Sequence, residues 1–196
     1  ENLTQYPRQW PADYALVLHS RDGRYFDVQQ SVSPLKTLDG ETMGAVMVLQ
    51  DVTASRELMK KLSYSASHDA LTGLPNRASF EKQLKAAIVA GGEPSPPHSL
   101  VFLDLDRFKA VNDTAGHAAG DALLRDIAQL MRHQLRNSDC LARLGGDEFG
   151  LILFDCRLEQ AKSLMQQVVN QISQHPFYWE GKIYRVGASA GITRIG

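Results

Sequence analysis

Long hydrophobic runs are missing from this sequence, and their absence limits the class of protein that it encodes. None of the apolar stretches in its 196 residues approaches the ~18 residues that a membrane-spanning helix needs. The first residues, ENLTQYPRQW, are too polar for a signal peptide. We therefore expect a cytoplasmic domain, and this expectation leaves open a membrane anchor elsewhere in a longer parent protein.

An excess of charge of one sign is also missing. The sequence has 21 Lys and Arg against 22 Asp and Glu, a formal net charge of -1. This balance gives no reason to expect binding to nucleic-acid polymers or anionic membranes, so any phosphate chemistry has to come from a local site. Cysteine is scarce too, and we expect Cys140 and Cys156 to be two free, buried thiols.

Turn signals divide the first quarter of the chain into short strand-like segments. Asp22-Gly23 and the stretch KTLDGE each predict a turn between runs that suit a β-strand. The sequence thus predicts three antiparallel strands, over residues 15–20, 25–32 and 43–52. Such a sheet has one face to bury and brings no helix of its own, so we interpret it as part of a domain.

A helix is predicted to follow at residues 53–68, where Leu58, Met59, Leu62 and Ala66 fall roughly on one side. The segment is too short and too weakly apolar to indicate a coiled coil. We interpret it as a connecting helix that can pair in a dimer.

The rest of the chain predicts an α+β domain. Asn76 is a plausible N-cap for a helix, and GGEPSPPH at 91–98 reads as an exposed loop. Beyond the loop the order is strand, helix, strand, strand, helix, strand, at residues 99–106, 121–135, the hairpin 140–154, 158–172 and 182–193. This order is the ferredoxin-like βαββαβ arrangement, in which helices cover one face of an antiparallel sheet.

Acidic residues stand at two points where buried strands end. Asp104 and Asp106 are two apart and share one face of a strand, while Asp147 and Glu148 occupy the hairpin tip. If the hairpin lies beside the first strand, Asp104 and one hairpin acid converge. Packed carboxylates repel unless a cation separates them, and Mg²⁺ suits such a site. Acids that merely face solvent at strand ends are the alternative.

Glycines and polar residues add features of a nucleotide site. Gly145 and Gly146 permit a tight turn whose backbone can contact a ligand, although an ordinary hairpin explains them as well. Lys109 is a cation suited to binding a phosphate, and a solvated surface lysine is the alternative. Asp121 can accept hydrogen bonds from the N1–H and amino groups of guanine, while Asn112 can both donate and accept. A helix N-cap at Asp121 and a turn at Asn112 are the structural alternatives.

Three stretches together resemble the GGDEF domain of diguanylate cyclases: DALTGLPNR, LDLDRFKAVNDTAGHAAGDALL and RLGGDEF. The resemblance implies that two GTP molecules, one on each of two facing domains of a homodimer, condense into cyclic di-GMP and release pyrophosphate. It implies Mg²⁺ or Mn²⁺ as the cofactor. The metal would be bound by the side chains of Asp104 and Asp147 and the backbone carbonyl of Leu105, and Asp147 and Glu148 would be the catalytic pair.

The same resemblance assigns the substrate. Phe108 matches a position whose backbone meets the phosphates, Lys109 a phosphate-binding position, and Asn112 and Asp121 the guanine-binding positions. Gly145 and Gly146 would admit the nucleotide.

RNSD, residues 136–139, resembles the inhibitory site of the family, where Arg136 and Asp139 would bind cyclic di-GMP. An arginine at a helix C-terminus followed by a turn aspartate is the alternative.

The resemblance also suggests how the chain is divided. Residues 1–53 resemble the C-terminal part of a PAS sensory domain, 54–68 form the linker helix, and 69–196 form a GGDEF domain without its usual C-terminal end, where a lysine and an arginine would clamp the triphosphate. We expect a cyclase under control of the sensor. The alternative is a catalytically weak GTP-binding module that regulates an attached cyclic di-GMP phosphodiesterase domain, and a cyclic di-GMP receptor is a third possibility. Further sensor, membrane or phosphodiesterase domains would belong to a longer parent.

Overall fold

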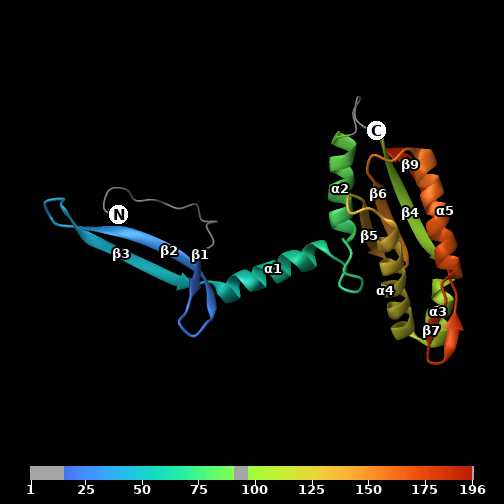
Figure 1. The fold of residues 1–196 in the computed structure, drawn as a ribbon, viewed down its shortest axis with the longest axis horizontal. Helices are drawn as coiled ribbons and strands as arrows, with labels where there is room; N and C mark the ends of the chain where they lie inside the picture. Colours follow the sequence, from blue (N-terminus) through green and yellow to red (C-terminus); the bar gives the residue numbers. More distant parts are fainter. Residues whose placement is uncertain (1–15, 91–96, 196) are drawn as a thin grey trace. The chain divides into compact units, whose positions relative to one another are not determined.

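The chain divides into two compact units, residues 1–64 and 65–196, in a computed structural model that describes residues 16–90 and 97–195 (Figure 1). Most of the loop expected at 91–98 lies outside the described residues. Among the described helices, none has the length and apolar character to cross a membrane.

The first unit contains the expected three-stranded sheet. Its strands β1 (Leu16–His19), β2 (Tyr25–Lys36) and β3 (Thr42–Asp51) are antiparallel and lie in the order β1-β2-β3. β2 is longer than predicted and runs through Pro34. This residue lies beyond Val28, the last β2 residue that pairs with β1, so β2 has a single described neighbour there and tolerates a residue without an N–H.

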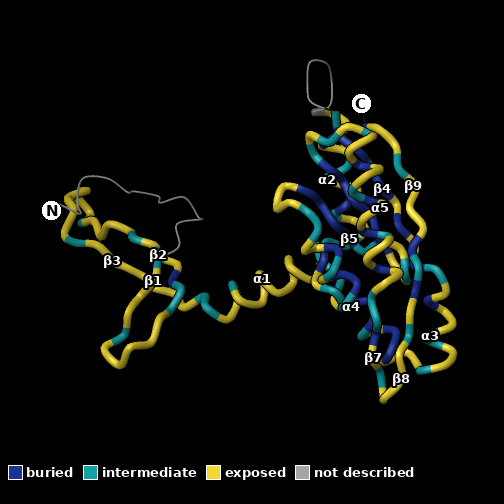
Figure 2. Tube along the Cα trace, turned by 45° about the vertical axis from the view of Figure 1, so that its right-hand side comes forward, coloured by how far each residue is buried: buried dark blue, intermediate teal, exposed yellow. Residues whose placement is uncertain are grey.

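Little of this unit is buried (Figure 2). Val28 is the only buried hydrophobic residue among those described before residue 65. Helix α1 (Thr53–Ser67) follows as expected, and its first residue accepts a hydrogen bond from the backbone N–H of Asp27 at 2.8 Å. Leu58, Met59 and Leu62 are exposed on α1. The sensory-domain interpretation of residues 1–53 stays a prediction, and residues 1–15 lie outside the described part.

The second unit is built on the predicted ferredoxin-like sheet. β4 (His98–Asp106), β5 (Cys140–Gly145), β6 (Glu148–Leu153) and β9 (Gly187–Ile195) are antiparallel, in the order β5-β6-β4-β9. β4 is central, and β6 of the hairpin lies beside it. The hairpin acids therefore reach the end of β4, as the sequence predicted.

Helices cover both faces of this sheet, whereas the sequence analysis placed them on one. α4 (His117–Gln134) and α5 (Leu158–Gln174) contribute Leu124, Ile127, Met165 and Val168 to the larger core. On the other face α2 (Arg77–Ala90) packs Phe80 and Ala87 against residues of the hairpin, Cys140, Ala142 and Ile152. The hairpin strands β5 and β6 are buried along most of their length on both faces, so each face of the hairpin needs a cover.

The region between β4 and β5 holds two helices where one was predicted. α3 (Phe108–Ala115) directly follows β4, and α4 begins at His117, four residues before the expected start at Asp121. Asp121 is thus inside a helix and is no N-cap, and Asn112 lies in α3 and forms no turn. Arg107 makes the abrupt start of α3 possible because it adopts a left-handed conformation, with φ of 62°.

The predicted last strand is divided in two. β8 (Lys182–Tyr184) pairs with a strand that the prediction missed, β7 (Phe177–Trp179), and β9 pairs with β4. The rings of Phe177 and Trp179 stack with their centroids 6.0 Å apart, which helps to hold this short hairpin together.

Both cysteines are free thiols, as expected, but only one is buried. Cys140 is buried beneath α2, and burial raises the pKa of its thiol to about 11. Cys156, which follows the end of β6, packs against the larger core but stays only partly buried.

Gly150 of β6 gives a test of the packing under α2. A Cβ there would lie 2.7 Å from Cζ and 2.8 Å from Cε2 of the buried Phe80 ring. We expect Gly150→Ala to lower the free energy of unfolding by about 1–3 kcal/mol in urea titrations, because the ring has to move. Gly191→Ala is the control, since a Cβ at Gly191 meets nothing within 4 Å. Equal loss in the two variants would contradict tight packing of α2.

Candidate active site

The register of β4 and β6 brings the predicted acids together. Asp104 lies directly opposite Glu148 in the antiparallel ladder, and the N–H of Leu105 donates to the carbonyl of Asp147 at 3.3 Å. Asp106 lies two residues further along β4 and accepts a hydrogen bond from Ser189 Oγ of β9 at 2.9 Å. Three strands thus converge on the end of β4 where the candidate acids stand.

Electrostatics reflects this convergence. Asp104 is exposed, but desolvation by its neighbours raises its pKa, and the charges of Asp147, Glu148 and Asp106 raise it further. Asp104 is therefore a carboxylate that gains from a nearby cation at neutral pH.

The oxygen atoms of these acids and of the nearby backbone could supply some, but not all, of the ligands of a hard divalent ion. Within the described part of the chain, no three His, Cys, Asp or Glu side chains form a group that could hold a metal by themselves. Carboxylate oxygens that repel one another, with a strand backbone beside them, suit Mg²⁺, which uses one or two protein carboxylates and completes its coordination with water and phosphate oxygens. The residues present therefore fit a metal that arrives with a phosphorylated ligand.

The glycine turn has the conformation that the sequence predicted. Gly145 and Gly146 have φ values of 147° and 52°, which favour glycine. A Cβ on either residue would meet nothing within 4 Å, so the space beside the turn is open. A ligand can therefore approach the backbone of the turn closely.

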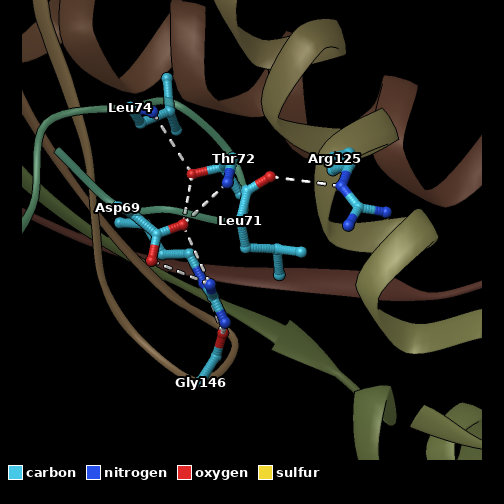
Figure 3. A network of polar contacts seen from close by, with 7 residues as sticks. Asp69, Leu71, Thr72, Leu74, Arg125 and Gly146 are labelled. Atoms are coloured by element: carbon cyan, nitrogen blue, oxygen red, sulfur yellow. Dashed lines mark hydrogen bonds and ion pairs between the residues drawn. The ribbon is translucent and has the colours of Figure 1, made fainter. Parts of the chain in front are cut away.

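An ion pair between Arg143 of β5 and Asp69, a residue outside the sheet, holds this turn (Figure 3). Arg143 donates from Nε and Nη2 to the carbonyl of Gly146, at 2.9 and 2.8 Å, and from Nη1 to the Asp69 carboxylate at 3.0 and 3.1 Å. The Arg143 side chain is only 13% exposed. Burial raises the pKa of Asp69, but hydrogen bonds from Thr72 and the Arg143 charge outweigh it and leave the pKa below its ordinary value.

Two further arginines attach the segment 69–77 to its surroundings, through three contacts. Arg77 donates to the carbonyl of Leu144 at 3.0 Å and lies 3.4 Å from Glu148 Oε2. Arg125 of α4 donates to the carbonyl of Leu71 at 3.3 Å (Figure 3). The segment DALTGLPNR, which the sequence analysis used only for the family resemblance and the N-cap at Asn76, thus supports the glycine turn.

Phe108 and Lys109 stand at the start of α3, two and three residues after Asp106. The Phe108 side chain is buried in the larger core, while Lys109 is exposed. No side chain caps this helix N-terminus. Its first backbone N–H groups and the positive end of its dipole suit a phosphate group.

Asn112 and Asp121 come from different helices that meet. Asn112 of α3 is half-buried against α4, beside Gly120, and Asp121 is exposed on the next residue of α4. The structure therefore brings the amide and the carboxylate to neighbouring positions, nine residues apart in the chain.

Arg136 and Asp139 belong to a different place. They precede β5, at the end of the hairpin away from the glycine turn, and line a cavity of about 170 Å³. Asp139 is buried, and its two carboxylate oxygens accept hydrogen bonds from the backbone N–H groups of Arg136, at 3.1 Å, and Phe154, at 3.3 Å. The carboxylate therefore has a structural role in this turn.

Sequence reasoning gave no role to Asp69, Arg143 and Gly120. Asp69 and Arg143 are 74 residues apart, and no spacing rule joins them. An isolated glycine within a helical pattern is a usable signal of close packing. It was missed at Gly120 because the helix was predicted to begin one residue later.

Known proteins resemble this chain over most of its length. Residues 66–196 match the family described as "Diguanylate cyclase, GGDEF domain". The chain is 59% identical over 180 residues to the probable diguanylate cyclase DgcE of Escherichia coli (strain K12), covering 92% of this chain and 16% of that protein. It is 34% identical over 166 residues to the cyclic di-GMP phosphodiesterase PdeB of Shewanella oneidensis, covering 85% of this chain and 19% of that protein. This chain therefore spans less than a fifth of either relative.

Solved structures are similar as well. The coiled coil and GGDEF domain of DgcB from Caulobacter crescentus, in complex with c-di-GMP, superposes with a TM-score of 0.67 at 26% identity, over 73% of this chain and 76% of that one. Diguanylate cyclase SiaD from Pseudomonas aeruginosa, in complex with its activator SiaC, gives 0.64 at 35% identity, over 72% and 54% of the two chains.

The acid cluster predicts a variant that is more stable than the natural protein. When folding raises the pKa of an acid, that acid lowers the stability of the protein at high pH. The loss develops as the pH rises from the pKa in the unfolded chain, about 4, through the pKa in the folded protein. Asp104→Asn removes this cost, so we expect its Tm at about pH 7 to be higher by roughly 1–2 °C in EDTA. The difference should vanish below about pH 3.5 and shrink when Mg²⁺ is added at neutral pH.

Scanning calorimetry across this pH range measures the difference. Asp113→Asn, an exposed acid on α3, is the matched control and should leave the Tm unchanged. A lower Tm for Asp104→Asn than for the natural protein at neutral pH would contradict the repulsion between these acids.

The Arg143 contacts predict a second effect. A lysine keeps the charge opposite Asp69 but cannot also donate two hydrogen bonds to Gly146, so we expect Arg143→Lys to lower the free energy of unfolding by about 1–2 kcal/mol. Amide hydrogen exchange of residues 144–148 should become faster. Arg24→Lys, in an exposed ion pair with Asp22, is the control and should have little effect. Unchanged exchange in the turn would show that Arg143 does not hold it.

Proposed function

The chain belongs to the GGDEF domain family of diguanylate cyclases, and from this premise we propose that the protein condenses two GTP molecules into cyclic di-GMP and releases two pyrophosphates. The observation that carries the proposal is the pairing of Asp104 with Glu148, beside Asp147, at the foot of an open glycine turn. Acids that repel one another next to an uncapped helix N-terminus suit a phosphate ligand that brings divalent ions.

In this proposal Asp104 and Asp147 hold Mg²⁺ or Mn²⁺ with their side chains, and Leu105 contributes its carbonyl. When bound, the ion shields the phosphates and stabilises the charge that develops on them. Glu148 accepts the proton of the 3′-hydroxyl that attacks the α-phosphate of the other GTP, or completes the metal site. Arg77 lies 3.4 Å from Glu148 and orients it.

The remaining site residues bind GTP. The backbone at Phe108 and the Lys109 ammonium receive the phosphates, and Gly145 and Gly146 let the nucleotide approach the turn. Asp121 accepts from the N1–H and amino groups of guanine, and Asn112 contacts another part of the base. Adenine presents an acceptor at N1 and is repelled by Asp121.

Two domains are needed because each one supplies a single GTP. We therefore propose a homodimer as the active form, with α1 as an element through which two copies can pair. The three-stranded sheet of residues 16–51 is proposed as the remainder of a PAS sensor that controls it.

A product-binding site is a second proposal for this domain. The cavity beside Arg136 favours it, because the guanidinium can bind a phosphate or stack on guanine. Asp139 would first have to release its backbone hydrogen bonds to use its carboxylate for a ligand.

A GTP-binding module without turnover is the alternative function. The relative PdeB, a cyclic di-GMP phosphodiesterase, favours it. In that case the domain would bind GTP and regulate a phosphodiesterase domain of a longer protein.

Nucleotide chromatography after incubation with GTP and Mg²⁺ tests the cyclase. We expect the full-length protein to form cyclic di-GMP and Asp104→Ala to lose at least about a hundredfold of the rate, because the metal-binding carboxylate is gone. Omitting the divalent ion should have the same effect. GTP binding without product would support the regulatory module. A protein that neither binds GTP nor forms product would contradict both proposals.

A further inference from the structure

Gly120 lies where two helices come unusually close. It is a buried residue in the first turns of α4 and faces α3. A Cβ placed on Gly120 would overlap with Oδ1 of Asn112 and would lie 2.9 Å from its Cγ. The carboxamide of Asn112 therefore occupies the volume that any other residue at position 120 would fill.

Stability alone does not account for a glycine at this position. Glycine in the interior of a helix is unfavourable compared with alanine, because its backbone loses more freedom on folding. Gly120 has no positive φ that would require it, unlike Gly116, whose φ is 84°. The severest overlap that glycine avoids at this position is with Asn112, and the contact with Phe108 is milder.

We propose that Gly120 is a positioning residue for recognition of the guanine base. It lets the Asn112 carboxamide lie against α4, one residue before Asp121, so that the two side chains present their donors and acceptors to one base. The inference rests on the proposed function, because it takes Asn112 and Asp121 as the residues that read guanine.

Substitution by alanine separates this role from folding. The overlapping atoms, Oδ1 and Cγ of Asn112, belong to a side chain and not to the backbone, so a change of the Asn112 rotamer relieves the overlap without a shift of either helix. The Phe108 ring, whose Cζ would lie 3.1 Å from the new Cβ, has to shift by only a few tenths of an ångström. The fold is kept and gains a better helix former, but the amide no longer points to where the base is read.

The experiment measures binding of 3′-deoxy-GTP, which lacks the attacking hydroxyl, to the full-length protein with Mg²⁺ by calorimetry. We expect Gly120→Ala to weaken binding about tenfold to a hundredfold and to reduce the preference for 3′-deoxy-GTP over 3′-deoxy-ATP. Its Tm should stay within about 4 °C of the natural protein. A defect in folding would lower the Tm and the number of binding sites and leave the preference for the base unchanged.

A double-mutant cycle decides whether Gly120 acts through Asn112. Asn112→Ala should weaken binding to a similar extent, and adding Gly120→Ala to it should cost nothing further, because the amide is already gone. The Asn112→Ala variant also allows the test if Gly120→Ala alone does not fold. In Asn112→Ala the carboxamide that the new methyl group would overlap is absent. Gly191→Ala, with open space around it, is the control for a glycine-to-alanine change.

Each outcome has a distinct meaning. The inference would be overturned if Gly120→Ala bound 3′-deoxy-GTP with the affinity and base preference of the natural protein. It would also be overturned if the losses of affinity of the two single variants multiplied in the double variant. Absence of any guanine preference in the natural protein would instead remove the proposed function on which the inference rests.

Discussion

The antiparallel register between β4 and β6 is the constraint on which the site depends. It places Asp104 opposite Glu148 and brings the backbone of Leu105 to that of Asp147. A shift of one residue would turn every side chain of β6 to the opposite face, moving Phe149 and Leu151 out of the larger core. The same apolar residues that stabilise the domain therefore fix the position of its acids. The free energy of core packing offsets the charge repulsion among these acids.

The sheet fixes the strands but leaves their connections free, and contacts from other segments restrain these connections. The glycine turn has no Cβ atoms to pack, and the Arg143 guanidinium supplies the missing restraint by linking the Gly146 carbonyl to Asp69. Directly after β4, Arg107 adopts a left-handed conformation that lets α3 begin at once. The N-terminus of α3 therefore stays close to the acids. The glycine turn is thus restrained through Asp69, which lies outside the sheet, and the start of α3 is set by the backbone conformation of Arg107.

Sequence patterns predicted the parts that follow from local periodicity. The buried strand ending at Asp106 and the hairpin of residues 140–154 have clear apolar runs, and their chain order leads to the ferredoxin-like sheet and to the meeting of Asp104 with the hairpin. α3 was missed because its polar sequence, with Asn112, Asp113 and Thr114, resembles a loop. The β7–β8 hairpin was missed because each strand has three residues, too few to show alternation. The Asp69–Arg143 pair could not be predicted, because only tertiary structure joins its members.

The different environments of the two thiols have a practical consequence for spectroscopy. With a pKa of about 11, Cys140 is a thiolate in only about one molecule in a thousand at pH 8, and α2 covers it. Cys156 is partly exposed and lines the cavity that contains Arg136 and Asp139. Burial and the charge of Asp139 raise the pKa of Cys156 as well, so its exposure is what lets a maleimide fluorophore or a fluorinated alkylating reagent attach there ahead of Cys140. Among these 196 residues, Cys156 is thus the accessible reporter position next to this cavity.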